Sequence, residues 1–171
     1  TEVDRTNSLV SRFLEFARPL ELRLETTDLN GLLDRAVARL ERDGSARKVT
    51  VYRNYSPDLG PFPLDAELME RVFHNLLLNA AQASPADGAI TIKTRRADGS
   101  AEVSVIDRGA GIDPKHRESI FNPFFTTTPE GVGLGLAIVA ELIAAHGGTV
   151  KLLETPGGAT FRIELPDRPP A

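Results

Sequence analysis

The sequence predicts an α+β fold, organised as a two-layer α/β sandwich with helices on one face of a mixed β-sheet. Some segments place apolar residues at the spacing of an amphipathic helix, and others alternate apolar and polar residues as a strand does. The two kinds of segment follow each other along the chain, and turn signals such as Asp98-Gly99 join neighbouring strands into hairpins. Helices that alternate with hairpins are typical of one sheet whose helices pack on a single face.

Four helices are predicted from apolar periodicity and from residues that cap or interrupt helices. Asp28 and Asp65 are suitable N-caps for the second and third helices, and Gly147-Gly148 closes the fourth. The first helix carries an apolar stripe that suits either packing against the domain or one flank of an oligomeric bundle. The predicted helices cover residues 2–17, 28–43, 65–85 and 134–146.

Strands are predicted where apolar and polar residues alternate, as they do from Ile90 to Lys93. One predicted strand begins at Val49. The others lie at residues 89–95, 103–105, 149–153 and 159–165. Three prolines between residues 57 and 63 predict an irregular connection before the third helix. Residues 108–135 form a long loop with a short helix over 114–120, and loops of this length are usually functional.

Composition limits the class of protein. A chain of 171 residues suits one domain with an appended helix and is long enough to bury a core. The net charge of −4 offers no broad attraction to nucleic acid or an anionic membrane, and the lack of cysteine excludes disulfides and thiolate metal sites. No apolar run approaches the ~20 residues that span a bilayer. Because the chain begins with Thr1 rather than Met, we expect a soluble piece of a longer protein.

Asn75 and Asn79 form the first candidate for chemistry. They lie four residues apart in a predicted helix whose residues between them are all leucine, so the two amides project from one face. Asparagine is a poor helix former, and a buried amide needs hydrogen-bond partners, so a pair on one face suggests a polar ligand. Amide oxygens suit a hard cation such as Mg²⁺, whose other ligands come from water and phosphate. An exposed polar helix face is the alternative.

The segment from Asp107 to Ile112 directly follows a predicted strand. A carboxylate at a strand end is able to accept hydrogen bonds from an exocyclic amine, and Gly109 and Gly111 permit close approach of a flat ligand. A tight turn closed by the aspartate side chain is the alternative.

Three glycines, Gly131, Gly133 and Gly135, lead into the last predicted helix. Backbone N–H groups would there meet the positive end of the helix dipole, an arrangement that suits phosphate. A flexible hinge is the alternative, and neither the dinucleotide fingerprint nor the GxxxxGK loop is matched. A phosphate site here would belong to another class.

Five motifs stand in a fixed order along the chain. They are Asn75-Leu-Leu-Leu-Asn79, Asp107-x-Gly109-x-Gly111, Phe121-Asn-Pro-Phe124-Phe125, Gly131-x-Gly133-x-Gly135 and Gly157-Gly158-Ala159-Thr160-Phe161. With them, residues 28–166 resemble the catalytic domain of sensor histidine kinases, which has the Bergerat ATP-binding fold shared with gyrase, heat-shock chaperone and mismatch-repair ATPases. The run Phe-Phe-Thr-Thr followed by Gly-x-Gly-Leu-Gly-Leu is similar to the nitrogen-regulatory type of two-component kinase.

The resemblance implies ATP and Mg²⁺ as ligands. Asn79 would ligate Mg²⁺ with help from Asn75, Asp107 would bind the adenine amino group, and Thr160 would lie at the pocket floor. The phenylalanines from Phe121 to Phe125 would anchor a mobile ATP lid. The implied catalytic and metal-binding residues are Asn75 and Asn79, and the implied nucleotide-binding residues are Asn75, Asn79, Asp107, Gly109, Gly111, Ile112, Phe124, Thr126, Gly131, Gly133, Leu134, Gly135 and Thr160.

The resemblance also divides the chain. Residues 13–19, FLEFARP, resemble the end of the second helix of a dimerisation and phosphoacceptor domain. The expected units are residues 1–20 as this helix, 21–27 as a linker, 28–166 as the catalytic domain and 167–171 as a tail. The implied partners are a phosphoacceptor histidine helix of the parent protein and, through that parent, a response regulator. A cytoplasmic fragment of a homodimeric parent is implied, with no nucleic acid and no direct membrane contact, and membrane anchoring of the parent is left open.

Three features depart from the family pattern. None of His74, His116 and His146 lies in a His-Glu helix, so no phosphoacceptor is expected in the chain. Relatives often carry lysine where this chain has Thr128, and a basic residue where it has Gln82. A degenerate module that only senses nucleotide is therefore one alternative to the kinase.

Two further alternatives are enzymes of the same superfamily. ATP hydrolases usually carry a water-activating glutamate where this chain has Asn75, which favours the kinase. A serine kinase of the anti-sigma-factor type is disfavoured by the FLEFARP segment, which indicates two-component architecture.

Overall fold

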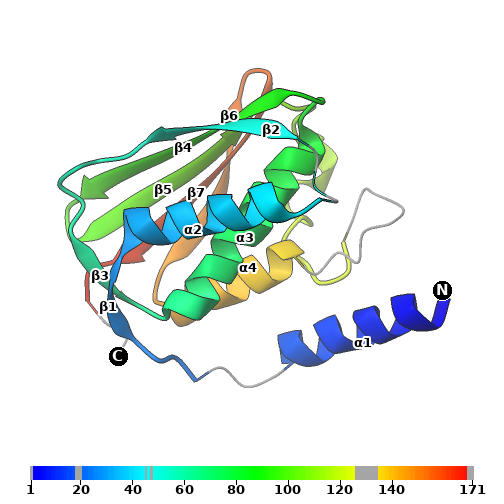
Figure 1. The fold of residues 1–171 in the computed structure, drawn as a ribbon, viewed down its shortest axis with the longest axis horizontal. Helices are drawn as coiled ribbons and strands as arrows, with labels where there is room; N and C mark the ends of the chain where they lie inside the picture. Colours follow the sequence, from blue (N-terminus) through cyan, green and yellow to red (C-terminus); the bar gives the residue numbers. More distant parts are fainter. Residues whose placement is uncertain (1, 18–20, 45, 47, 126–134, 169–171) are drawn as a thin grey trace.

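The computed structural model describes residues 2–17, 21–44, 46, 48–125 and 135–168. One layer is a five-stranded sheet, and three helices cover a single face of it, as Figure 1 shows. These helices are α2 (Leu29–Arg42), α3 (Ala66–Ala83) and α4 (Gly135–Ala145). The N-terminal helix α1 (Glu2–Ala17) lies apart from the sandwich in the same view. The predicted fold class is confirmed.

The sheet is mixed, as predicted. Its strands lie in the order β2-β4-β5-β7-β6, with β2 parallel to β4 and every other pair antiparallel. Their bounds are β2 Val49–Asn54, β4 Gly88–Ala97, β5 Ser100–Asp107, β6 Thr149–Thr155 and β7 Gly158–Pro166. The Asp98-Gly99 hairpin forms between β4 and β5, with Gly99 at φ +69°. A positive φ of this kind explains why glycine is needed in the turn.

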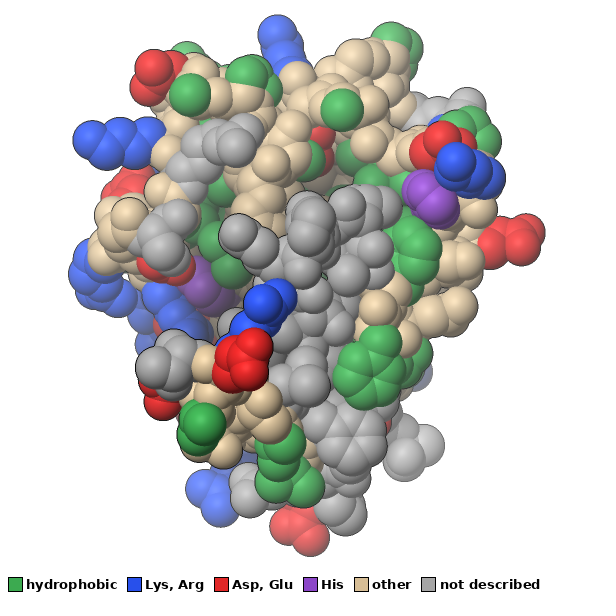
Figure 2. Space-filling view, turned by 90° about the vertical axis from the view of Figure 1, so that its right-hand side faces the viewer, with side chains coloured by type: hydrophobic (Ala, Val, Ile, Leu, Met, Phe, Trp, Pro, Cys, Tyr) green, Lys and Arg blue, Asp and Glu red, His purple; other side chains and the backbone are tan. Residues whose placement is uncertain are grey.

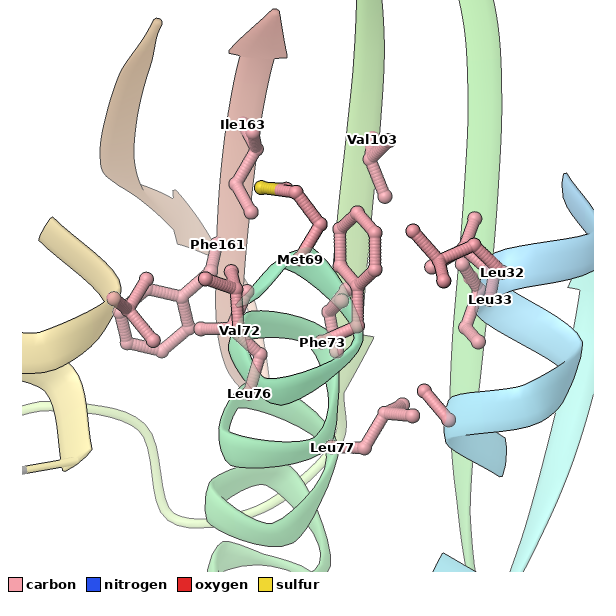
Figure 3. Packing of buried hydrophobic residues seen from close by; sticks show 14 of the residues in the cluster. Leu32, Leu33, Met69, Val72, Phe73, Leu76, Leu77, Val103, Phe161 and Ile163 are labelled. Carbon is pink, nitrogen blue, oxygen red and sulfur yellow. The ribbon is translucent and has the colours of Figure 1, made fainter. Parts of the chain in front are cut away.

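The core lies between the sheet and the helices. Phe73 of α3 points toward Val103 of β5 and is flanked by Leu32 and Leu33 of α2, as Figure 3 shows. All four side chains are at most 1% exposed. Burying side chains of this size stabilises a fold by roughly 1.5–3 kcal/mol each, so the position of α3 on the sheet is strongly determined.

The predicted caps of the helices are confirmed at some helix ends and not at others. Asp65 caps α3, because its Oδ1 accepts a hydrogen bond from the Leu68 N–H at 3.1 Å. Asp28 occupies the N-cap position of α2, but its side chain makes no capping hydrogen bond. At the end of α4, Gly147 has φ +77° and the Gly148 N–H donates to the Ile143 carbonyl at 2.9 Å. This Schellman arrangement is what the glycine pair predicts.

A small second sheet was not predicted. Strand β1 (Glu25–Asp28) pairs antiparallel with β3 (Pro61–Leu64), so the expected irregular connection at the prolines is wrong, and a strand begins inside the expected linker. Pro63 is tolerated because a two-stranded ribbon leaves one side of each strand unpaired, and a missing N–H costs nothing there. Phe62 and Leu64 are buried and anchor the ribbon to the core.

One further detail concerns element type. The short helix expected over residues 114–120 is a 3₁₀ turn, Pro114–His116, followed by irregular turns.

Across the described parts of the chain, every helix is too short or too polar to cross a membrane. The boundaries expected for the phosphoacceptor helix and the tail stay predictions.

Candidate functional site

The helix face of α3 presents Asn75 and Asn79 at the surface of the helical layer. Both side chains are half-buried, while Leu76 and Leu77 beside them are fully buried in the core. This division follows from the sequence, because the leucines face the sheet and turn the two amides away from it. Neither amide has a hydrogen-bond partner among the described residues, so both are available to a ligand.

Asp107 ends β5 and is only 2% exposed. Its Oδ1 accepts hydrogen bonds from the Gly109 N–H at 2.9 Å and from the Ala159 N–H at 3.2 Å. Two donors on one oxygen fix the orientation of the carboxylate. Within the described residues, Oδ2 makes no hydrogen bond and is left as an acceptor for a ligand amine.

Two glycines bring the segments around Asp107 together. A Cβ on Gly109 would collide with the carbonyl of Ala83, which lies one helical turn beyond Asn79. A Cβ on Gly158 would collide with the carbonyl of Asp107 itself. The end of α3, the loop after β5 and the start of β7 therefore meet at backbone distance, which brings Asp107 near the end of the helix that carries Asn79.

A cavity of about 500 Å³ opens beside this junction, between the loop after β5 and the β6–β7 hairpin. It lies in the size range of small-molecule sites. Its walls include Gly111 and Ile112, both predicted from sequence, and Ala159, whose N–H holds Asp107. Arg117 also lines it.

Thr160 lies elsewhere. In the register of β5 and β7, Thr160 pairs with Ile106, whereas Asp107 follows Ile106 and faces the opposite side of the sheet. Its hydroxyl is hydrogen-bonded to Thr155 Oγ1 at 2.6 Å. The structure thus does not bring Thr160 together with Asp107, and Ala159 takes that place. Sequence reasoning missed Ala159. Its signal was a small side chain directly after Gly157-Gly158, at the start of a strand.

The phenylalanine segment is partly anchored. The ring of Phe121 packs edge-on against Phe161 of β7, with 6.1 Å between centroids, and the rings of Phe125 and His116 pack at a tilt of 55°. Phe124 has φ +67° and is 51% exposed. An aromatic residue in this backbone region is strained, and such strain is found mainly at functional segments.

The predicted phosphate loop is described only at its end. Gly135 is the first residue of α4, with open space around it. The predicted residues Thr126, Gly131, Gly133 and Leu134 lie outside the described part of the chain.

Charge is mixed at this end of the molecule. Figure 2 views the molecule from the right-hand side of Figure 1 and shows basic, acidic and hydrophobic side chains of the described residues interspersed on that face. Two charges of opposite sign close together largely cancel at a distance, so any phosphate recognition on this face has to come from local groups.

Comparison with known proteins decides the family. Residues 64–169 match the family described as histidine kinase-, DNA gyrase B- and HSP90-like ATPase. The chain belongs to this family. A relative of this ATPase domain, the signal transduction histidine-protein kinase AtoS of Escherichia coli (strain K12), is 37% identical over 170 residues, which are 98% of the chain and 28% of AtoS. The chain thus spans little more than a quarter of this relative.

Two solved histidine-kinase structures share the ATPase fold. Full-length ShkA in complex with AMPPNP has a TM-score of 0.82 at 32% identity, covering 98% of this chain and 37% of ShkA. The histidine kinase ThkA in complex with the response regulator protein TrrA has a TM-score of 0.83 at 27% identity, covering 98% of this chain and 49% of ThkA. The predicted family is confirmed, and its members bind ATP.

A Mg²⁺ site in this domain would rest on few protein ligands. Within the residues that the structure describes, no three histidine, aspartate or glutamate side chains gather as a metal site. Mg²⁺ is commonly held by one or two protein oxygens together with substrate phosphates. The ligand-free amides of Asn75 and Asn79 fit that pattern.

His74 was not singled out by the sequence. It is 9% exposed, and among the described residues its Nδ1 has no hydrogen-bond partner. Burial, followed by the nearby charge of Arg39, lowers the pKa of His74 below its ordinary value. The imidazole next to Asn75 is therefore held neutral, and no motif pointed to it.

Proposed function

We propose that this chain is the ATP-binding catalytic part of a sensor histidine kinase and transfers the ATP γ-phosphoryl group to a histidine on a separate phosphoacceptor helix. The observation that carries the proposal is the junction at Asp107, where a buried, oriented carboxylate lies beside the helix that carries Asn75 and Asn79. This arrangement suits a ligand with an exocyclic amine at one end and a phosphate-bound cation at the other.

Each residue would have a separate task. Asp107 Oδ2 would accept the adenine amine, with Gly109, Gly111 and Ile112 shaping the pocket around the base. Asn79, assisted by Asn75, would hold Mg²⁺ on the ATP phosphates. The metal would supply charge stabilisation for the phosphoryl group, and the protein would contribute mainly position. Phe124 and the segment from Thr126 to Gly135 are proposed to cover the phosphates, and Thr160 is left out of the site.

The histidines of the chain support a separate acceptor. His74 and His146 are buried, at 9% and 2% exposure, and His116 packs against the ring of Phe125 in the loop. A phosphoacceptor has to present its imidazole in line with the γ-phosphate, which buried side chains cannot do. We therefore propose that the acceptor helix belongs to the parent protein, a homodimer, and that the phosphate continues to a response regulator in the cytoplasm.

Phosphate transfer between separate molecules tests the proposal. The chain is incubated with radiolabelled Mg-ATP and with a separately produced helical hairpin from its parent that carries the phosphoacceptor histidine. We expect no stable label on the chain itself and acid-labile, base-stable label on the hairpin. Labelling should be slow and should rise with hairpin concentration, because the two parts are not tethered.

An Asn79→Ala chain is the control for this experiment and should leave the hairpin unlabelled. ATP binding without transfer to any hairpin would instead favour a nucleotide-sensing module. Steady release of inorganic phosphate without labelling would favour an ATP hydrolase.

A further inference from the structure

Asp65 joins three segments of the chain. Its Oδ1 accepts the Leu68 N–H within α3, and its Oδ2 accepts the N–H of Arg23, at 3.0 Å, from the segment between α1 and β1. Its own N–H donates to Nε2 of His146, at 3.1 Å, at the end of α4. Asp65 is 7% exposed, so these bonds form with little competition from water.

The imidazole of His146 accepts that hydrogen bond at Nε2. It is 2% exposed, and its Nδ1 lies 2.7 Å from the Leu142 carbonyl. The Asp65 N–H is only a donor, so Nε2 has to be the acceptor and Nδ1 has to carry the hydrogen. One neutral tautomer thus satisfies both ring nitrogens, and the ring connects the end of α4 to the N-cap residue of α3.

The hydrogen bond from Asp65 to His146, the bridge, lies at one end of the packed helices α3 and α4. Since the start of α3 meets the end of α4, the two helices run antiparallel, and their opposite ends carry Asn79 and Gly135 (Figure 1). Asn79 is about 20 Å along α3 from the bridge at 1.5 Å per residue. At that distance, a change of about 5° between the helix axes displaces the far ends by roughly 2 Å, and misplacement of about 1 Å can slow a reaction about a hundredfold.

We propose that Asp65 and His146 are positioning residues, whose hydrogen bond sets α3 against α4 and thereby aligns the Asn75/Asn79 face with Gly135, the first residue of α4. This inference rests on the proposed function and names residues outside the proposed nucleotide contacts. The adenine end of the site is held by the backbone contacts of Asp107 and by the packing of the end of α3 on Gly109, so a change at the bridge is expected to move the start of α4 relative to a fixed adenine end.

Two substitutions of His146 differ only in which bond they restore. In His146→Gln, the longer amide reaches the position of Nε2 and accepts the Asp65 N–H. In His146→Asn, the shorter amide reaches the position of Nδ1, donates to Leu142 and leaves the Asp65 N–H buried without an acceptor. Both replacements are neutral and polar, and both remove the imidazole ring. A difference between the two variants therefore reports the hydrogen bond to the Asp65 N–H and not the loss of the ring.

The two variants are compared by three measurements on the full chain. Affinity for AMP reports the adenine end, affinity for Mg-AMPPNP reports both ends, and transfer to the phosphoacceptor hairpin reports alignment. His146→Asn should lower Mg-AMPPNP affinity about tenfold and transfer about a hundredfold, with AMP affinity within about twofold. His146→Gln should remain within about threefold of the unchanged chain in all three. All assays are run well below the thermal midpoint of each variant.

Three results overturn the inference. Equal behaviour of the Gln and Asn variants would show that the bridge is not what matters. A parallel loss of AMP and Mg-AMPPNP affinity in His146→Asn would show that His146 supports the fold as a whole. If the unchanged chain bound AMP but gained nothing from Mg²⁺ and phosphates, the proposed function would fail, and the inference with it. If neither His146 variant folds, Asp65→Pro and Asp65→Ala take their place, because both lose the carboxylate that accepts the Leu68 and Arg23 N–H groups and only Asp65→Pro, at a position with φ −80°, also loses the N–H that donates to His146.

Discussion

The two ends of the candidate site are built differently. At the adenine end, Asp107 is almost fully buried and held by two backbone N–H groups, with Gly109 and Gly158 packed against neighbouring carbonyls. At the phosphate end, the amides of Asn75 and Asn79 are half-buried and make no hydrogen bond to the described residues. The carboxylate at the first end is already oriented in the folded chain, whereas we propose that the amides at the second end gain their partners from the bound ligand.

The difference follows from the ligands. An exocyclic amine is read by one short hydrogen bond, which gains from an acceptor that is already oriented. A hydrated Mg²⁺ keeps several waters and brings phosphate oxygens with it, so it needs only a few protein oxygens. We therefore expect substitutions at the two ends to affect nucleotide binding in separable ways.

The largest effect is expected at the phosphate end. Asn79→Ala should abolish the gain in ATP affinity that Mg²⁺ provides, because the amide oxygen is the proposed ligand, while AMP affinity should change little. Calorimetric titration with and without Mg²⁺ measures this, with Asn54→Ala on an exposed part of β2 as a matched control. An unchanged Mg²⁺ effect in a folded variant would remove Asn79 from the site.

The next effect is expected at the adenine end. Asp107→Asn keeps an oxygen for the Gly109 and Ala159 N–H groups but replaces Oδ2 with a donor. ATP affinity should fall by about 1–3 kcal/mol, the usual contribution of a hydrogen bond to a charged group, and the preference for ATP over GTP should shrink. Titration with both nucleotides checks this. Full ATP affinity with the same preference would show that another residue recognises the base.

A backbone substitution tests whether the adenine end is built by close approach. Gly158→Ala forces a methyl group against the Asp107 carbonyl and should destabilise the fold by about 1–3 kcal/mol, as overpacking does. Gly44→Ala, at an exposed position with open space, should be near neutral. Urea denaturation of both variants measures the difference. Equal stability would mean that the three segments adjust without strain.

The smallest effect concerns acid. Because the pKa of His74 is lowered in the folded chain, the unfolded chain binds the proton more tightly, so the stabilisation is present above pH ~6.5 and is lost as pH falls toward the folded pKa. His74→Leu should flatten this part of the pH dependence, because leucine takes up no proton in either state. Thermal unfolding between pH 5 and 8 measures it. An unchanged slope would place the acid sensitivity in other groups.

Sequence alone determined the layer architecture and most elements, and it pointed to most residues of the candidate site. Local signals explain this success, because a cap such as Asp65, a hairpin turn at Gly99 and a helix stop at Gly147 each act within a few residues. Asn75 and Asn79 were equally accessible to sequence reasoning, since their spacing puts both amides on one side of α3.

Only the tertiary structure decided the features that depend on partners distant in the chain. The β1–β3 ribbon pairs residues far apart in sequence, and its prolines masked it because they are poor strand residues elsewhere. The side of β7 that faces Asp107 depends on the strand register, and a shift of one residue exchanges Ala159 for Thr160. The His146 bridge to Asp65 likewise depends on how α4 packs against α3, because no local pattern encodes the acceptor that a buried imidazole will find.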